Sequence, residues 1–208
     1  MAEVLHAGAP LARARAAAIL LHGRGADAQG MLTLGEEFGQ EDIAYLAPQA
    51  PGHSWYPYSF LAPLEQNEPY LSLALATVGA TLDHAATAGF TPERVALIGF
   101  SQGGCLALEY AARTAKRYGA VAGLSAGLIG PPGTPRDDAG SFAGTPVFLG
   151  CSDVDSHIPL ARVHETRNVL TRMGAAVTER IYPGMGHTVN ADEIAHVSRL
   201  LAGIGAMP

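Results

Sequence analysis

One serine of this chain stands where it could act as a nucleophile. The stretch Gly99-Phe100-Ser101-Gln102-Gly103 fits the pattern Gly-x-Ser-x-Gly, with an apolar run before it and a segment of helical character after it. This context is typical of a nucleophile elbow, a strained turn that lifts the serine hydroxyl above a sheet. A side chain at position 99 or 103 would collide with the neighbouring strand or helix. The alternative is a turn that binds phosphate, but the Gly-x-Gly-x-x-Gly spacing of dinucleotide-binding proteins is missing.

A nucleophilic serine needs a base, and His187 is the best placed of the eight histidines. It ends the glycine-rich turn 183–187, which follows the expected strand 177–182 and leads into a helical segment. The alternative for this residue is a surface-loop histidine. Two further histidines lie in loops that could reach a pocket, His53 and His157. The others fit a base poorly because they fall in the N-terminal tail or in expected helices, where we expect solvated side chains: His6, His84, His164 and His196.

The imidazole of the base must be held in one tautomer, and its cation stabilised, by a carboxylate from a separate loop. Asp155 fits that role because it follows the apolar run 147–150 and precedes a helical segment. Asp153 is its rival, only two residues away. If Asp155 takes the role, Asp153 is a loop or capping residue.

A serine that attacks a carbonyl also needs hydrogen-bond donors for the oxyanion that forms. One expected donor is the backbone N–H of Gln102, directly after the nucleophile. The second is expected from His22-Gly23-Arg24-Gly25, whose glycines let the backbone approach closely. The N–H of Arg24 is the preferred donor, with its neighbours as alternatives. The Arg24 guanidinium is a separate matter, and a solvated surface charge is favoured over a substrate ligand.

These residues all lie close to short apolar runs that indicate strands buried on both faces of a parallel sheet. The expected strands are 16–21, 43–47, 95–100, 120–124, 147–150 and 177–182. Helical segments lie between them, near 28–39, 69–88, 102–117, 160–173 and 190–202. This alternation predicts an α/β fold with a mostly parallel, doubly wound sheet and helices on both faces. The reactive site of such a fold lies at the carboxyl ends of the strands.

Two segments carry more specific expectations. In the helix expected over 102–117, Cys105, Leu108 and Ala112 share one stripe, and the pair Glu109/Arg113 faces away from it. The segment 127–145 has no convincing period and is expected to be a loop or a lid. Its glycines and prolines argue against a second domain, so residues 1–208 are expected to form one domain.

Composition excludes some classes of partner. Apolar residues make up 48% of the 208 residues, charged residues only 15%, and the formal charge is −6. This balance provides no basic surface for nucleic acid or for an anionic membrane. The low charge leaves room for an apolar pocket or a subunit interface, so a homodimer is an open alternative, although a core rich in small residues would produce the same composition.

Targeting signals and cysteines bear on location. Arg13 and Arg15 precede the apolar run 16–21 in the order of a signal peptide, but that run is too short for one. No apolar stretch is long enough to span a bilayer. Two cysteines in a chain of this length form no disulfide framework. We therefore expect a soluble, cytoplasmic protein.

Four segments together resemble the phospholipase/carboxylesterase family of α/β-hydrolases, which includes the acyl-protein thioesterases. They are LLHGRGAD at 20–27, GFSQGG at 99–104, DVDSHIP at 153–159 and YPGMGH at 182–187. The resemblance covers residues 20 to about 196. It implies an α/β-hydrolase fold, without a large cap domain, in which the triad residues follow the order Ser, Asp, His.

The resemblance also implies roles for individual residues. The family's serine and histidine fall on Ser101 and His187, and its oxyanion donors on Arg24 and Gln102. Its aspartate stands four residues before a proline, which favours Asp155.

The sequence departs from the family pattern in three places. Cys151 and Ser152 stand where His-Gly is common, and Arg24 stands where an apolar residue is frequent. The segment 53–64 is aromatic and resembles a pocket wall, with Trp55 as the expected substrate contact. Cys105 lies a turn into the helix after the nucleophile, so we expect an ordinary buried thiol there and not the cysteine nucleophile of dienelactone hydrolases.

Residues and resemblance together predict a serine carboxylesterase that hydrolyses small to medium acyl esters through an acyl-enzyme, with a small-molecule ester as its partner. No metal-binding motif is present, and the chemistry needs no cofactor. One alternative is an acyl-protein thioesterase or lysophospholipase, which would need a long apolar channel. Another, from a different class, is a non-catalytic ligand-binding protein on the same fold. Since an unperturbed histidine has a pKa near 6.5, activity is expected to fall in acid as His187 is protonated.

Overall fold

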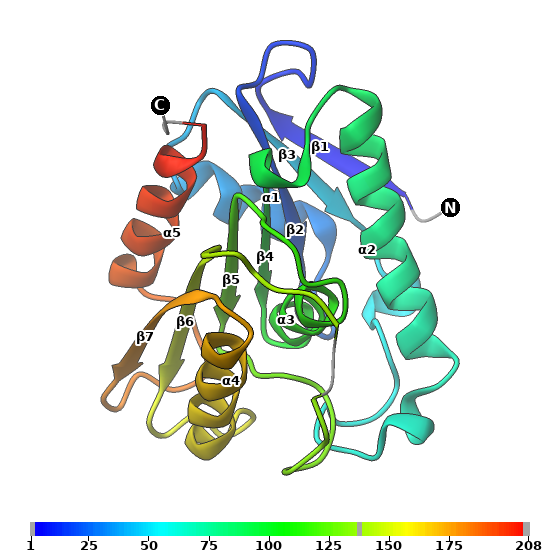
Figure 1. The fold of residues 1–208 in the computed structure, drawn as a ribbon, viewed down its shortest axis with the longest axis vertical. Helices are drawn as coiled ribbons and strands as arrows, with labels where there is room; N and C mark the ends of the chain where they lie inside the picture. The colour runs from blue at the N-terminus through cyan, green and yellow to red at the C-terminus, as the bar shows by residue number, and fades with distance from the viewer. Residues whose placement is uncertain (1–2, 137–138, 206–208) are drawn as a thin grey trace.

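The computed structural model describes residues 3–136 and 139–205, and its centre is a seven-stranded sheet (Figure 1). The strand order is β1-β3-β2-β4-β5-β6-β7. Strands β2 to β7 are parallel to their neighbours, and β1 runs antiparallel to β3 at one edge. The strands are β1 (Val4–Gly8), β2 (Ala16–Leu21), β3 (Ile43–Pro48), β4 (Val95–Phe100), β5 (Ala120–Leu124), β6 (Pro146–Ser152) and β7 (Ala176–Tyr182).

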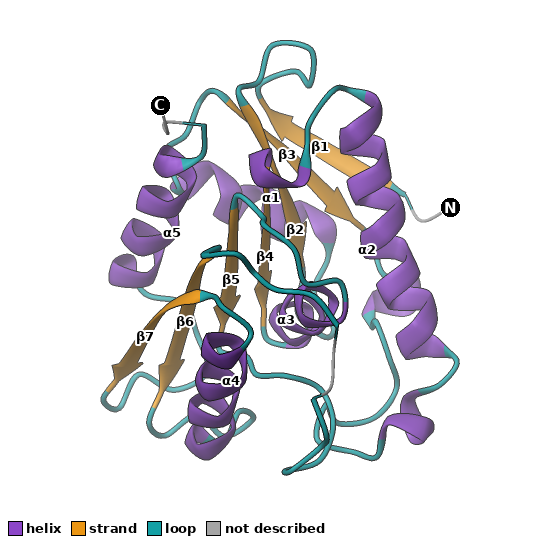
Figure 2. Ribbon diagram, in the orientation of Figure 1, coloured by secondary structure: helices purple, strands orange, loops and turns teal. Residues whose placement is uncertain are grey.

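Helices cover both faces of this sheet, as Figure 2 shows. Helices α2, α3 and α4 pack on one face, and α1 and α5 pack on the other. Their bounds are α1 (Ala28–Glu37), α2 (Tyr70–Thr87), α3 (Gln102–Arg113), α4 (Leu160–Arg172) and α5 (Ala191–Gly203). The mostly parallel, doubly wound architecture predicted from the sequence is confirmed.

The central strands are apolar throughout because each of their faces contributes to a different core. In β2, Ala17, Ile19 and Leu21 pack beneath α2 and α3, and the intervening side chains pack against the opposite layer of helices. All six residues of β2 have no exposed surface. Alternation between two buried faces explains why these strands appear as unbroken apolar runs in the sequence.

The structure corrects three expectations about the elements. Residues 4–8, expected to be a tail that contains His6, form the edge strand β1. Helix α3 ends at Arg113 and not at residue 117, because Thr114 leaves the helical conformation. Glu109 does not face solvent: it is fully buried and accepts hydrogen bonds from Arg113 and Arg136.

The segment 127–145 forms no helix or strand in its described part, and residues 137–138 lie outside the described residues. Its first residues are anchored and buried rather than raised as a lid. The N–H of Leu128 donates to the Thr166 hydroxyl, and the N–H of Ile129 donates to Glu109. The N–H of Gly130 donates to the Phe60 carbonyl, which connects this segment to the aromatic segment 53–64.

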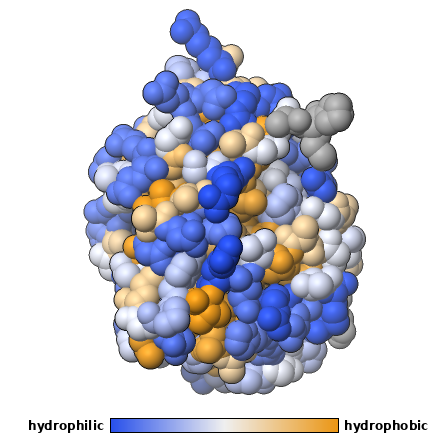
Figure 3. Space-filling view, turned by 90° about the vertical axis from the view of Figure 1, so that its left-hand side faces the viewer, coloured by the Kyte–Doolittle hydropathy of each residue, from blue (hydrophilic) through white to orange (hydrophobic). Residues whose placement is uncertain are grey.

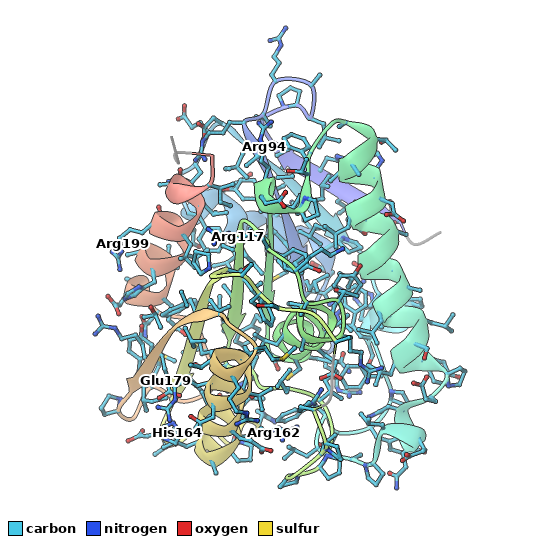
Figure 4. All side chains as sticks on the ribbon, in the orientation of Figure 1. Arg94, Arg117, Arg162, His164, Glu179 and Arg199 are labelled. Atoms are coloured by element: carbon cyan, nitrogen blue, oxygen red, sulfur yellow. The ribbon has the colours of Figure 1, made fainter. Side chains whose placement is uncertain are left out.

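Two of the histidines expected to be solvated have partners instead. His164 on α4 lies beside Glu179 on β7, with its Nδ1 3.1 Å from the carboxylate (Figure 4). The ring of His196 on α5 stacks on Phe148 at 4.8 Å between centroids.

On the side of α5 and β7, apolar and hydrophilic residues are interspersed over the surface (Figure 3). Across the described residues, no helix combines the length and the apolar character that crossing a membrane requires.

Candidate active site

Ser101 occupies the sharp turn between β4 and α3. Its φ of 53° and ψ of −121° are strained for a residue with a side chain. Glycine is needed on both sides of it. A Cβ at position 99 would lie 2.3 Å from the backbone of Gly103, and a Cβ at position 103 would lie 2.1 Å from the carbonyl oxygen of Leu21. Only glycine lets the turn pack this closely against α3 and β2.

Ser101, His187 and Asp155 form a continuous hydrogen-bonded chain. The Oγ of Ser101 lies 2.9 Å from Nε2 of His187, and Nδ1 of His187 lies 2.7 Å from Oδ2 of Asp155. An ionised carboxylate only accepts hydrogen bonds, so Nδ1 carries the proton and Nε2 is free to accept from the serine hydroxyl. This arrangement suits general-base activation of Ser101.

The Asp155 carboxylate is buried and fully occupied. Its Oδ1 accepts the backbone N–H groups of His157 and Ile158 at 2.8 and 3.0 Å. Burial alone would raise the pKa of Asp155, but the hydrogen bonds from His187 and from these two amides outweigh burial and leave its pKa below the usual value. Asp155 is therefore held as an anion beneath the imidazole.

Asp153, the alternative carboxylate, lies elsewhere. It is exposed, and its Oδ1 accepts the N–H of Gly184 at 2.8 Å. It therefore caps the turn that leads to His187 without contacting the ring.

Two backbone amides are available where the oxyanion donors were expected. Within the described part of the chain, the N–H groups of Arg24 and Gln102 donate to no other residue. The oxyanion-hole loop, residues 22–25, runs close to the nucleophile: a Cβ on Gly23 would lie 3.4 Å from the Cβ of Ser101. The amides of this loop and of the first residue of α3 are thus free to bind a ligand oxygen.

The side chain of Gln102 has a role that the sequence did not reveal. Its Oε1 accepts the N–H of Trp55 at 3.0 Å, and its Nε2 donates to the carbonyl of Tyr56 at 2.8 Å. The residue expected to supply a backbone donor therefore also anchors the aromatic segment 53–64 against α3.

Trp55, the expected substrate contact, is not among the described residues that line the cavity beside Ser101. Its side chain is 3% exposed, and its indole donates to the carbonyl of His22 at 2.8 Å. The neighbouring residues of the same segment, Tyr56 to Phe60, line the cavity in its place. The aromatic segment 53–64 does supply part of the cavity wall. Which of its residues face the cavity depends on the path of the chain after Ser54.

The cavity above Ser101 has a volume of about 620 Å³. His157, one of the two loop histidines, lines it and packs against the His187 ring at 4.7 Å between centroids. His53, the other one, is absent from the described lining and has its Nδ1 2.8 Å from the Ala26 carbonyl oxygen. Cys105 lies at the cavity wall, and burial raises the pKa of its thiol to about 12, as expected for an inert thiol.

A second cavity, of about 330 Å³, adjoins the first and shares Gly23, Ala26 and Phe100 with it. Its wall includes Thr188 and Val189, the two residues that follow His187. Ser101 and the His187 side chain line the larger cavity, and the smaller one adjoins the backbone that follows His187.

Comparisons with known proteins support a family assignment. The family model described as Phospholipase/Carboxylesterase matches residues 4–203. A crystal structure of a phospholipase/carboxylesterase from Dyadobacter fermentans is 40% identical, covers 97% of both chains and superposes with a TM-score of 0.93.

Curated relatives give a consistent result. Acyl-protein thioesterase 1 of Saccharomyces cerevisiae is 25% identical over 95% of this chain and 96% of its own. Acyl-protein thioesterase 1 of Gibberella zeae is 30% identical over 54% of this chain, and that match spans about half of the relative's length.

Proposed function

Because the chain belongs to the phospholipase/carboxylesterase family of α/β-hydrolases, which are serine hydrolases that cleave ester bonds, we propose that it is a serine carboxylesterase acting on small to medium acyl esters. The observation that carries this proposal is the hydrogen-bonded chain from Ser101 through His187 to Asp155. In the proposal, these three residues are the catalytic triad.

The reaction begins with the attack of Ser101 Oγ on the ester carbonyl. His187 Nε2 takes the serine proton, and the Asp155 carboxylate stabilises the resulting imidazolium without accepting a proton itself. The tetrahedral oxyanion accepts hydrogen bonds from the backbone amides of Arg24 and Gln102, whose N–H groups are free to donate.

The intermediate collapses when His187 protonates the leaving oxygen, which releases the alcohol and leaves an acyl-enzyme on Ser101. Water then attacks the acyl-enzyme with His187 again as base, and the acid is released. Each proton that His187 takes is returned, so the cycle balances without a further reactant.

The proposed chain-length range follows from the cavity. About 620 Å³ holds a small or medium acyl group, and the wall formed by Tyr56 to Phe60 bounds it. A thioester or lysophospholipid substrate is the alternative, since curated relatives of this chain are named acyl-protein thioesterases. Such a substrate would need room for a long acyl chain.

The test is the initial rate of hydrolysis of p-nitrophenyl esters from acetate to palmitate, with Ser101→Ala measured beside wild type. Short esters should be turned over by wild type, and the variant should lose activity by roughly a million-fold, as in a comparable triad. A serine-directed phosphonate should label wild type and not the variant. A rate maximum at long chains would favour the lipid or acyl-protein substrate.

Absence of both turnover and labelling in wild type would overturn the proposal in favour of a ligand-binding protein.

The proposal also includes two expectations about location and oligomeric state that came from the sequence. The cytoplasmic location agrees with two buried, unpaired cysteines, Cys105 and Cys151. The homodimer alternative is decided by sedimentation velocity.

A further inference from the structure

We propose that the acyl group of the natural substrate ends in a carboxylate and that Arg24 binds it. This inference rests on the proposed esterase function of the same site. It concerns the guanidinium of Arg24, as distinct from the backbone N–H that faces the oxyanion.

The charge of the large cavity is the first observation. Among the described residues that line it, Arg24 is the one with a permanent charge, and none is an aspartate or glutamate. The chain as a whole carries a formal charge of −6, so a cationic pocket is not what its composition would produce on average. An anion entering this cavity meets a local positive charge with no carboxylate on the wall to oppose it.

Arg24 is an exposed residue, and its guanidinium is hydrogen-bonded to neutral groups. Its Nη1 donates to the Ser54 hydroxyl at 3.1 Å and to the Pro57 carbonyl at 2.9 Å, and its Nη2 donates to the Tyr58 carbonyl at 2.7 Å. The charge is therefore positioned at the cavity wall without being neutralised. By contrast, the buried Arg136 and Arg162 each pair with a glutamate.

Arg24 also keeps donors for a ligand. A guanidinium has five N–H groups, and three of them make the contacts just described. Within the described residues, no acceptor is bonded to Nε–H or to the second Nη2–H. In a guanidinium, Nε–H and one Nη2–H form an edge that matches the two oxygens of a carboxylate.

The second cavity indicates which part of the ester carries the anion. His187 must protonate the leaving oxygen, and the residues after it, Thr188 and Val189, line the smaller cavity. His187 itself lines the larger cavity. We assign the leaving alcohol to the smaller cavity because it adjoins the backbone beyond His187 and because Asp27 and Glu37 in its wall would repel an anionic group there. The acyl group is left with the larger cavity, where Arg24 can bind an anion.

The experiment compares two esters of similar shape at pH 7.5. Mono-p-nitrophenyl adipate carries the carboxylate, and p-nitrophenyl 6-methylheptanoate replaces it with an apolar branch. Adipate is used because shorter half-esters cleave themselves through cyclic anhydrides. The values of kcat/KM are measured for wild type, Arg24→Gln, Arg24→Lys and the surface control Arg172→Gln, which makes the same charge change far from the cavity.

Wild type should prefer the adipate ester by about tenfold or more, as expected for a charge-assisted pair. Arg24→Gln should abolish this preference, and Arg24→Lys should keep part of it. Because Arg24 also supplies a proposed oxyanion N–H, the readout is the ratio of the two kcat/KM values within each protein and not either rate alone. Arg172→Gln should behave like wild type. Added salt should reduce the preference of wild type.

A wild-type enzyme that cleaves the neutral ester equally well or better overturns the inference and leaves the esterase proposal intact. If wild type cleaves neither ester, the esterase proposal fails, and calorimetric binding of adipate to Ser101→Ala then decides the inference. Binding that is lost in the double variant Ser101→Ala/Arg24→Gln supports it. Absence of adipate binding overturns it.

Discussion

The Ser152 hydroxyl oxygen accepts the backbone N–H of Gly186 at 3.0 Å, one position before His187. The same oxygen accepts the N–H of Val154 at 3.1 Å, one position before Asp155. Ser152 is fully buried. One hydroxyl thus joins the loop that carries the Asp155 carboxylate to the loop that carries the His187 imidazole, and so helps to set the distance between them.

Replacing this hydroxyl should impair both stability and rate. In Ser152→Ala, two partly buried hydrogen bonds lose their acceptor, which should destabilise the fold by about 1 kcal/mol. A misplaced His187 should lower kcat more than it raises KM. Denaturant unfolding and steady-state kinetics measure the two effects.

Ser156 provides the matched control for Ser152. It lies in the same loop and is exposed. Ser156→Ala should therefore leave stability and kcat close to wild type. Equal effects of the two substitutions would show that the loop, and not the shared hydroxyl, sets the geometry.

Substitution by asparagine should lower kcat much more at Asp155 than at Asp153. Asp155→Asn keeps the size of the side chain but no longer stabilises the imidazolium, so kcat should fall roughly 10,000-fold, as in a comparable triad. Asp153→Asn removes only an exposed carboxylate that caps Gly184. Kinetics on a short p-nitrophenyl ester should show most of the activity retained. A larger loss in Asp153→Asn than in Asp155→Asn would reverse the assignment.

Gly103→Ala tests the packing behind the nucleophile. The added methyl would lie 2.1 Å from the Leu21 carbonyl oxygen, so α3 must move away from β2. We expect a loss of about 1–3 kcal/mol in unfolding free energy. Gly203→Ala is the control because a Cβ there meets nothing within 4 Å at the end of α5, and it should leave stability unchanged or raise it by up to about 1 kcal/mol. A well-tolerated Gly103→Ala would contradict the close approach of α3 to β2.

The buried carboxyl of Glu193 should make the free energy of unfolding depend on pH. Burial raises the pKa of this carboxyl from 4.5 to about 7, and its Oε1 has no hydrogen-bond partner among the described residues. Between these values the folded state binds a proton that the unfolded state has lost, so stability falls as pH rises. From pH 5.5 to pH 8, Glu193 should remove about 2 kcal/mol of stability.

Glu193→Gln isolates this effect, because glutamine does not titrate and can still accept the Asn190 N–H that Glu193 accepts at 2.9 Å. Relative to wild type, the variant should gain about 2 kcal/mol between pH 5.5 and pH 8, measured by denaturant unfolding at both values. The lowered pKa of Asp155 acts in the opposite direction but at more acidic pH, so it does not interfere. If the unfolding free energy of the two proteins changes with pH in the same way, the pKa of Glu193 is not raised by burial.

Much of the fold was predictable because the central strands carry strong local signals. Five of the six expected strands are short apolar runs, since both faces of the sheet are covered by helices there. The sixth, 177–182, contains Glu179 and Arg180 and forms the partly exposed edge strand β7. Strand β1 was missed because it is an edge strand of five residues, only partly buried, with no such run. Its place in the sheet depends on antiparallel pairing with β3, a contact that no local pattern encodes.

Several properties of the site could not be predicted, because they depend on segments far apart in the chain. Glu109 looks like a surface residue by helical periodicity, but Arg136 and the backbone of Ile129 cover it. The Arg24 guanidinium is exposed, as the sequence suggested, but its hydrogen bonds to Ser54 and to the Pro57 carbonyl were not predictable. In each case the partner comes from a loop whose path has no sequence period.

The sequence by itself determined the order of strands and helices from β2 to α5, the glycine-flanked turn at Ser101, and the positions of Asp155 and His187 after strands. These features follow from apolar runs and from steric demands on glycine, which act within a few residues. The tertiary structure alone decided that Tyr56 and its successors line the cavity in place of Trp55, that Ser152 joins two loops, and that Arg24 faces the larger cavity. Those outcomes depend on hydrogen bonds and packing between distant segments, which exist only when the chain is folded.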